Sequence, residues 1–124
     1  MANQVSRWLN LRHWPNYMIF FVTARCNAAC KMCFYKENMD NNLTKEELSV
    51  AEYEKISARI EYINVLGISG GEPFLRQDLA EILKVFYRNC RPLVVDLPTN
   101  AYLTEQVLRQ VEETARACPG MTAG

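Results

Sequence analysis

"YINVLGISGGEPFLR", residues 62–76, joins an apolar run to a glycine-rich loop, and this pattern decides the fold. The run is mostly continuous rather than alternating, as expected of a strand that is covered on both faces in a parallel sheet. Two similar runs, "YMIFFVT" (Tyr17–Thr23) and "LVVDLPT" (Leu93–Thr99), stand before and after it in the chain. We therefore expect three parallel strands of an α/β protein.

Helical patterns fill the intervals that follow these strands. Thr44 and Ser49 each begin a capping box, so we expect a short turn at the first residue and the main helix from the second. Asp78 is predicted to cap the second helix by similar logic, and Thr104 to cap the third. The chain thus contains three strand–helix units, with right-handed crossovers expected between the strands.

Composition narrows the class of protein. The chain has 124 residues, of which 49% are hydrophobic, and a formal net charge of zero, which fits one small domain or part of a larger one. Because there is no basic stripe, nucleic-acid binding has no electrostatic support. The apolar run at residues 17–22 is much shorter than the roughly 20 residues that span a bilayer, and no signal-peptide pattern is present. We expect a cytosolic (cytoplasmic) protein with no membrane partner.

The longest interval contains a cysteine loop. "ARCNAACKMCFY" (residues 24–35) places Cys26, Cys30 and Cys33 inside eight residues, within a predicted loop of about 20 residues. Thiolates suit zinc or iron–sulfur clusters, but structural zinc takes four protein ligands, and no fourth cysteine or histidine is near. A [4Fe–4S] cluster on three cysteines keeps one iron open to a small molecule. The spacing favours this interpretation over zinc and over unrelated thiols.

The remaining soft or aromatic side chains are expected to be structural. An odd number of cysteines without an export signal argues against a disulfide framework. Cys90 and Cys118 are expected after the second and third helices, at the end of the sheet opposite the cysteine loop, as incidental thiols. His13 is expected to be a surface or packing residue. Trp8 and Trp14 are expected to pack an N-terminal segment against the core or against a part of the fold that this chain lacks.

A glycine loop, "GISGGEPFLR" (residues 67–76), follows the second strand and so lies at the same end of the sheet as the cysteine loop. Gly70 and Gly71 remove side chains where a ligand could approach the backbone. Glu72 would present a carboxylate suited to an ammonium group, and Pro73 pushes it toward an extended conformation. Taken alone, the segment would more often be a tight turn with Glu72 in solvent, but its place beside the cysteine loop favours a ligand-binding role.

Three stretches of the sequence resemble the radical S-adenosylmethionine (SAM) superfamily. They are "TARCNAACKMCFY", "GISGGEPFLRQDL" and "PTNAYLTEQVL", in family-like order and separation, and "SGGEPFLR" is most similar to the branch of peptide and protein maturases and cofactor-synthesis enzymes. The resemblance implies that Cys26, Cys30 and Cys33 hold a [4Fe–4S] cluster whose open iron binds the amino and carboxylate groups of SAM. It also implies reductive cleavage of SAM to a 5′-deoxyadenosyl radical that abstracts hydrogen from a substrate. An electron donor such as flavodoxin or ferredoxin would be a partner.

The resemblance also assigns a cofactor-binding set, which comprises Met32, Phe34, Tyr35, Ser69, Gly70, Gly71, Glu72, Thr99 and Asn100. Within it, Glu72 is implied to contact the SAM amino group and Met32 to pack near the adenine. Met32 stands where the family commonly has an aromatic residue, and a flexible thioether can fill the same space. Ala101 stands where the family often has glycine, and it is strained if that turn needs a positive φ.

The fold implied by the resemblance is a parallel (β/α)-repeat, partial TIM-like barrel. Since the family core has six such units, this chain would hold three of them in residues 17–124, after an N-terminal extension in residues 1–16. The third strand would then have a bare edge. We therefore expect a fragment, either a truncated gene product or one piece of a split enzyme that lacks its C-terminal half.

Two other functions stay open. A non-catalytic remnant would bind a cluster without a full SAM pocket, and a zinc-stabilised interaction domain would bind no cluster at all. The substrate is not determined by these residues, and a peptide, a nucleotide precursor or another small molecule would each fit the resemblance. Asp96, inside the third strand, points either toward the cofactor or onto an exposed face of the sheet.

Overall fold

The structure, a computed structural model, describes residues 15–42 and 44–124. One parallel sheet contains β1 (Tyr17–Thr23), β2 (Val65–Gly70), β3 (Val94–Asp96) and β4 (Thr122–Ala123), in that order. The helices are α2 (Lys36–Asn42), α3 (Val50–Ser57), α4 (Leu79–Cys90) and α5 (Thr104–Ala117), with a short 3₁₀ helix, η1 (Pro73–Leu75). The expected α/β class is confirmed. The predictions for Trp8, His13 and Trp14 lie outside the described residues.

The strands stand in the sheet in the same order as in the chain. Successive strand–helix units therefore always add a neighbour on the same side, as in a (β/α) barrel, whereas a doubly wound sheet reverses direction at its switch point. Ile19, Gly67 and Asp96 share one row across β1, β2 and β3. This arrangement agrees with a partial barrel, and it brings the loops after β1, β2 and β3 to one edge.

The expectation of a bare edge on β3 is wrong. The residues after α5 turn back and form β4, which pairs with Val94 and Val95. The Gly124 N–H donates to the Val95 carbonyl at 2.8 Å, and the Leu97 N–H donates to the Gly124 carbonyl at 3.2 Å. These bonds satisfy backbone groups of β3 that would otherwise need water.

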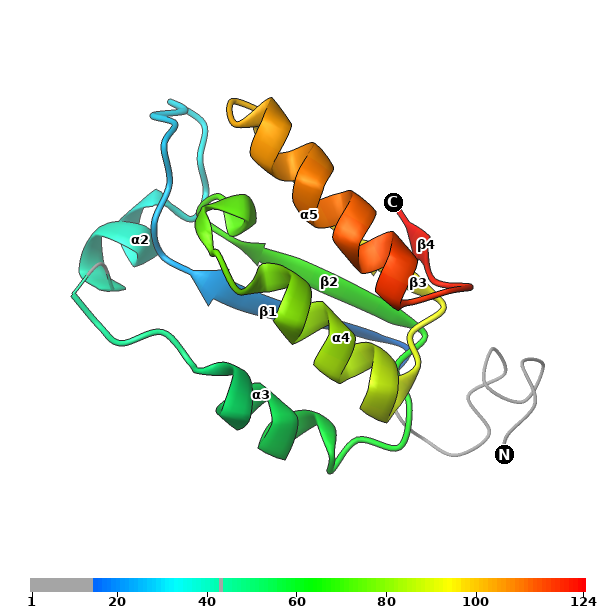
Figure 1. The fold of residues 1–124 in the computed structure, drawn as a ribbon. Coiled ribbons are helices and arrows are strands. Elements are labelled where there is room, and N and C mark those ends of the chain that lie inside the picture. Colours follow the sequence, from blue (N-terminus) through cyan, green and yellow to red (C-terminus); the bar gives the residue numbers. More distant parts are fainter. Residues whose placement is uncertain (1–14, 43) are drawn as a thin grey trace.

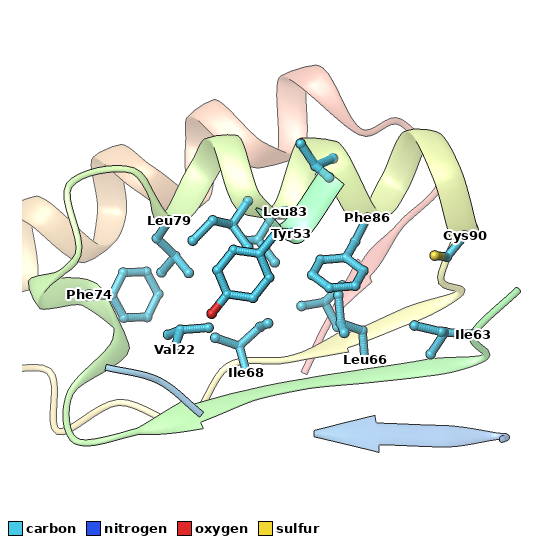
Figure 2. Packing of buried hydrophobic residues seen from close by; sticks show 13 residues of the cluster. Val22, Tyr53, Ile63, Leu66, Ile68, Phe74, Leu79, Leu83, Phe86 and Cys90 are labelled. Carbon is cyan, nitrogen blue, oxygen red and sulfur yellow. The ribbon is translucent and has the colours of Figure 1, made fainter. Parts of the chain in front are cut away.

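Helices α3, α4 and α5 cover one face of the sheet, as Figure 1 shows. Beneath them, Leu66 and Ile68 of β2 are fully buried, and α4 places Leu83 and Phe86 over them (Figure 2). The other face has no helix in the described part of the chain, and the β1 side chains that alternate onto it are exposed: Tyr17, Ile19 and Phe21. The sheet therefore has one packed face and one open face.

Of the helix caps predicted from the sequence, one is confirmed and two are wrong. Ser49 begins α3 as predicted, because its hydroxyl and the Glu52 carboxylate form the complete capping box. Asp78 makes no cap bond to α4, since its carboxylate instead accepts hydrogen bonds from Arg76. Thr104 is the first residue of α5 rather than its cap, and Leu103 holds the cap position.

The interval between β1 and α3 is not the continuous loop that we expected. Its second part folds into α2, whose Met39 is buried, and the predicted turn follows at Thr44. The cysteine loop is therefore only residues 24–35. Within the described ranges, no helix is long and apolar enough to cross a membrane.

Candidate functional site

The cysteine loop and the glycine loop pair through their backbones beyond the ends of β1 and β2. The Gly71 N–H donates to the Thr23 carbonyl at 2.9 Å, and the Glu72 N–H donates to the Arg25 carbonyl at 2.8 Å. A Cβ on Gly71 would stand 2.1 Å from the Arg25 oxygen, and one on Gly70 would stand 2.2 Å from the Thr23 oxygen. The absence of a side chain therefore lets Gly70 approach the backbone at the end of β1 and lets Gly71 approach the backbone of the cysteine loop. SAM contact at Gly70 and Gly71 stays a prediction.

Glu72 is a carboxylate held where three segments meet. Its side chain is only 3% exposed, and its φ of −106° and ψ of 106° are the extended conformation predicted before Pro73. The carboxylate accepts hydrogen bonds from the Thr99 hydroxyl at 2.9 Å, the Asn100 N–H at 2.8 Å and the Phe74 N–H at 3.3 Å. The alternative of a solvent-exposed Glu72 in a plain turn is therefore wrong.

The partners of Glu72 are all donors, and none is a cation. The Thr99 hydroxyl oxygen accepts the Ala101 N–H at 3.0 Å, so its own proton is directed at Glu72. In the described ranges, every ion pair joins other residues. Burying a carboxylate anion without a counter-charge is costly, and hydrogen bonds offset only part of that cost. The site is therefore suited to a cationic ligand.

A side-chain bridge connects the end of β3 to the cysteine loop. The Asn100 side-chain amide donates to the Asn27 oxygen at 2.8 Å, one residue beyond Cys26. Ala101, the next residue, has a φ of +58°, so the turn does require the strained conformation considered above. Asn27 was not singled out from the sequence, because a polar residue inside a loop carries no local signal of such a distant partner.

The three cysteines of the loop are accessible thiols. Cys30 is exposed, Cys26 and Cys33 are half-buried, and none is in a disulfide. The Ala28 N–H donates to the Cys26 sulfur at 3.4 Å, and the Cys33 N–H donates to the Cys30 carbonyl at 3.2 Å. Soft, unpaired thiols on one short loop are the donor set that an iron–sulfur cluster or zinc takes, so the residues fit a metal centre.

The sulfurs do not form a finished metal site. Among residues 15–42 and 44–124, no three His, Cys, Asp or Glu side chains lie together as a group that could hold a metal ion. A metal held by all three thiols would therefore require the loop to tighten, which is common because ligand groups rarely converge fully without the metal.

Some of the predicted cofactor-binding residues give the cysteine loop an apolar surface. Met32 is 92% exposed and Phe34 is 86% exposed, although the Phe34 ring lies near that of Tyr35, with centroids 6.4 Å apart. Tyr35 is half-buried and lies against Phe21 of β1, with ring centroids 4.6 Å apart. Ser69 pairs with Phe21 in the neighbouring strand. The structure thus brings Tyr35 and Ser69 to the open face and leaves Met32 and Phe34 facing solvent.

Arg76 anchors the glycine loop to neighbouring segments of the chain. Its side chain is 4% exposed and donates to both oxygens of Asp78, at 2.8 and 2.6 Å. It also donates to the Val22 carbonyl at 2.9 Å and to the Leu48 carbonyl at 3.0 Å, which ties β1 and the segment before α3 to the loop. An Arg-x-Asp pair directly after a strand loop could have signalled this bidentate contact.

Glu47 completes this anchor beside the cysteine loop. Its carboxylate accepts a hydrogen bond from the Thr23 hydroxyl at 2.5 Å and pairs with Arg25 at 3.0 Å. Burial alone would raise the pKa of Glu47, but these hydrogen bonds outweigh burial and lower it. A hollow of about 380 Å³ opens beside this pair, and Tyr35 is the one predicted cofactor residue among those that line it.

Cys90 and Cys118 lie at the far ends of α4 and α5, as expected, and both are buried. Burial raises the pKa of the Cys90 thiol to about 11, and it also raises the pKa of Cys118. Both thiols are therefore poor nucleophiles and poor metal ligands at neutral pH.

The fold and these loops define an α/β protein of the (β/α)-repeat type, with a candidate metal and cofactor site at the carboxyl edge of its sheet. Comparison with known proteins makes this more specific. The family model for the radical SAM superfamily matches residues 20–119. Since that match covers most of the chain, the protein belongs to the radical SAM superfamily.

Curated relatives include proteins named GTP 3′,8-cyclase. The protein from a Sulfurovum species is 33% identical over 103 residues, which are 79% of this chain and 31% of the relative. A probable GTP 3′,8-cyclase from Methanococcus aeolicus is 35% identical over 96 residues, covering 74% of this chain and 31% of the relative. The chain therefore spans about 31% of the length of these relatives.

Proposed function

We propose that this chain is the cofactor-binding part of a radical SAM enzyme. Cys26, Cys30 and Cys33 would hold a [4Fe–4S] cluster, and Glu72 would bind SAM beside it. When bound, this pair of cofactors supplies one-electron, reductive cleavage of a carbon–sulfur bond and so the hydrogen abstraction from a substrate. Membership of the superfamily supports the proposal, as does the accessible, unpaired state of the three thiols.

The buried, cation-free carboxylate of Glu72 is the observation that carries this proposal. Thr99 and Asn100 hold its two oxygens in place, and a carboxylate has acceptor capacity beyond its three bonds. An ammonium group would therefore find an oriented anion with no competing cation. Asn100 also contacts Asn27, so the residue that orients Glu72 is coupled to the loop that bears the thiols.

The other predicted cofactor residues would place the rest of SAM. The exposed side chains of Met32 and Phe34 offer an apolar surface for a flat adenine ring, and Tyr35 adds a second aromatic face. Ser69, Gly70 and Gly71 would line the methionine part through hydroxyl and backbone groups. By fixing SAM against the cysteine loop, these residues would supply proximity and exclude water.

The finer parts of the proposal concern the whole enzyme. We infer a cytoplasmic peptide or protein maturase, or a cofactor-synthesis enzyme, which receives electrons from a flavodoxin or ferredoxin. A C-terminal part would complete the barrel. The name shared by the relatives also makes GTP a candidate substrate of the whole protein.

Anaerobic reconstitution tests the proposal. The full chain should take up iron and sulfide, and with dithionite and SAM it should produce 5′-deoxyadenosine above the level of a Cys30→Ala variant. Glu72→Gln should retain iron but bind SAM about tenfold to a hundredfold more weakly in equilibrium dialysis, the loss expected of a charged hydrogen bond. Glu105→Gln, which changes an exposed carboxylate on α5, is the matched control.

The possible outcomes separate the competing functions. Bound zinc, with no chromophore after iron and sulfide are supplied, would establish the interaction domain instead. Iron uptake without 5′-deoxyadenosine or SAM binding would favour the non-catalytic remnant. Equal SAM binding by the Glu72→Gln and Glu105→Gln variants would contradict the role given to Glu72.

A further inference from the structure

A polar pair crosses the open face of the sheet. The Tyr17 hydroxyl, from β1, donates to the Asp96 carboxylate on β3 at 3.1 Å, across the intervening strand β2. A Cβ on Gly67 of β2 would lie 3.0 Å from the Tyr17 hydroxyl oxygen and 3.1 Å from a carbon of Ile19. Gly67 therefore allows the tyrosine ring to pass over β2, which resolves the earlier question about Asp96: it faces the open side.

The charge on this open face is negative. By strand alternation and register, the described side chains that β1, β2 and β3 present there are Tyr17, Ile19, Phe21, Val65, Ser69, Val94 and Asp96, with Gly67 between them. None of these is a lysine or an arginine. Within residues 15–42 and 44–124, the hydrogen-bond partner of Asp96 is the neutral Tyr17 hydroxyl, so the carboxylate keeps unused acceptor capacity. That hydrogen bond also raises the pKa of Tyr17, so the phenol remains a donor at neutral pH.

The open face is continuous with the candidate cofactor site. Phe21, near the end of β1, packs against Tyr35, which follows Cys33 by two residues. On the open face, Asp96 lies in the row of residues next to that of Phe21 and Ser69. It is about 7 Å farther from the carboxyl ends of the strands. A small substrate that binds Asp96 can therefore extend to the cysteine loop along the apolar side chains of β1.

We infer that Tyr17 and Asp96 form a recognition subsite for the ammonium or guanidinium group of a cationic substrate. The inference rests on the proposed function, because it takes the open face as the substrate side of the cofactor site. A carboxylate surrounded by apolar surface attracts such a group more strongly than the same carboxylate in water. A triphosphate should bind poorly at this face, because it would place several negative charges beside Asp96. No lysine or arginine of β1, β2 or β3 is there to pair with them.

Titration of the ¹⁵N-labelled full chain tests this subsite directly. N-acetylarginine amide should shift the amide signals of Gly67 and Asp96 in a saturable manner, and GTP should leave them unchanged. Asp96→Asn, which can still accept the Tyr17 hydroxyl proton, should bind the arginine compound about tenfold more weakly. Asp40→Asn, which removes an exposed carboxylate of α2 paired with Lys36, should bind it as the wild type does.

The inference is overturned if GTP shifts these signals and the arginine compound does not, if neither compound shifts them, or if Asp96→Asn binds the arginine compound as tightly as Asp40→Asn. If Asp96→Asn fails to fold, the titrations of the wild-type chain with the arginine compound and with GTP still test the inference. The titration needs no iron and no SAM. A chain that binds the arginine compound but takes up no cluster would therefore refute the proposed function and leave the subsite standing.

Discussion

The glycine loop and the cysteine loop lie side by side, yet the protein holds their shapes very differently. In the glycine loop, Glu72, Phe74 and Arg76 are buried and hydrogen-bonded to neighbouring segments. In the cysteine loop, Cys30 and Met32 are exposed, and the sulfurs do not converge. The difference indicates that the glycine loop is a preformed scaffold, whereas the cysteine loop would acquire its final shape from the metal centre that we propose for it.

The largest expected effect comes from breaking the scaffold at Arg76. Arg76→Ala leaves the Val22 and Leu48 carbonyls and the Asp78 carboxylate without their shared donor, so we expect a loss of about 3–5 kcal/mol in the free energy of unfolding. Urea unfolding measures this loss. Arg116→Ala, which removes an exposed ion pair on α5, should cost less than about 0.5 kcal/mol. Similar losses in both variants would mean that Arg76 is not an anchor.

A smaller loss is expected from Gly71→Ala. The new Cβ would meet the Arg25 carbonyl at 2.1 Å, so the paired backbones must separate, and we expect a cost of about 2–3 kcal/mol. Gly120→Ala is the control, because its φ of +83° is strained for alanine but its Cβ would have nothing within 4 Å. That variant should cost about 1 kcal/mol. Thermal unfolding that ranks the two variants in the reverse order would refute the close pairing of the loops.

Acid should weaken the scaffold through Asp78. The hydrogen bond from Arg76 lowers the pKa of Asp78 below its ordinary value of 3.8. Because the folded-state pKa is the lower one, this stabilisation is present above about pH 4 and is lost as the pH falls through the folded-state pKa. Asp78 is partly exposed, so we expect less than about 1 kcal/mol.

Urea unfolding of the wild type and of Asp78→Asn at several pH values measures this contribution. The wild type should be the more stable protein at pH 7, and the difference should shrink below pH 4 as the wild-type carboxylate becomes protonated. A difference that stays constant between pH 7 and pH 3 would show that Asp78 does not titrate in this window.

The smallest effect on stability is expected in the cysteine loop itself. Cys30→Ala should change the free energy of unfolding of the metal-free chain by less than about 0.5 kcal/mol, because the side chain is exposed, yet it should abolish stable iron uptake. Cys118→Ala should lower the free energy of unfolding by about 1 kcal/mol, because Cys118 is buried. It should leave iron uptake unchanged, because Cys118 lies far from the cysteine loop. Iron analysis and thermal unfolding of both variants test the contrast, and loss of iron in Cys118→Ala would contradict it.

Several features of the fold were predictable because their signals are local. Continuous apolar runs placed β1, β2 and β3, and the capping box placed the start of α3 at Ser49. Proline restricts the residue before it, so Pro73 correctly predicted the extended conformation of Glu72. The predicted cap at Asp78 failed because a nearby arginine competes for the same carboxylate. Helix α2 was missed since its sequence, "KENMDNN", has only one buried residue and no apolar period.

The sequence by itself determined the class of protein, the three thiols on one loop and the Gly-Gly-Glu-Pro turn, because residue chemistry and spacing are properties of neighbouring positions. Only the tertiary structure decided that Glu72 is buried without a cation and that Tyr17 reaches Asp96, 79 positions away in the chain. Such pairs depend on strand order and register, which are set by the packing of the whole sheet against its helices and leave no trace in any short stretch of sequence.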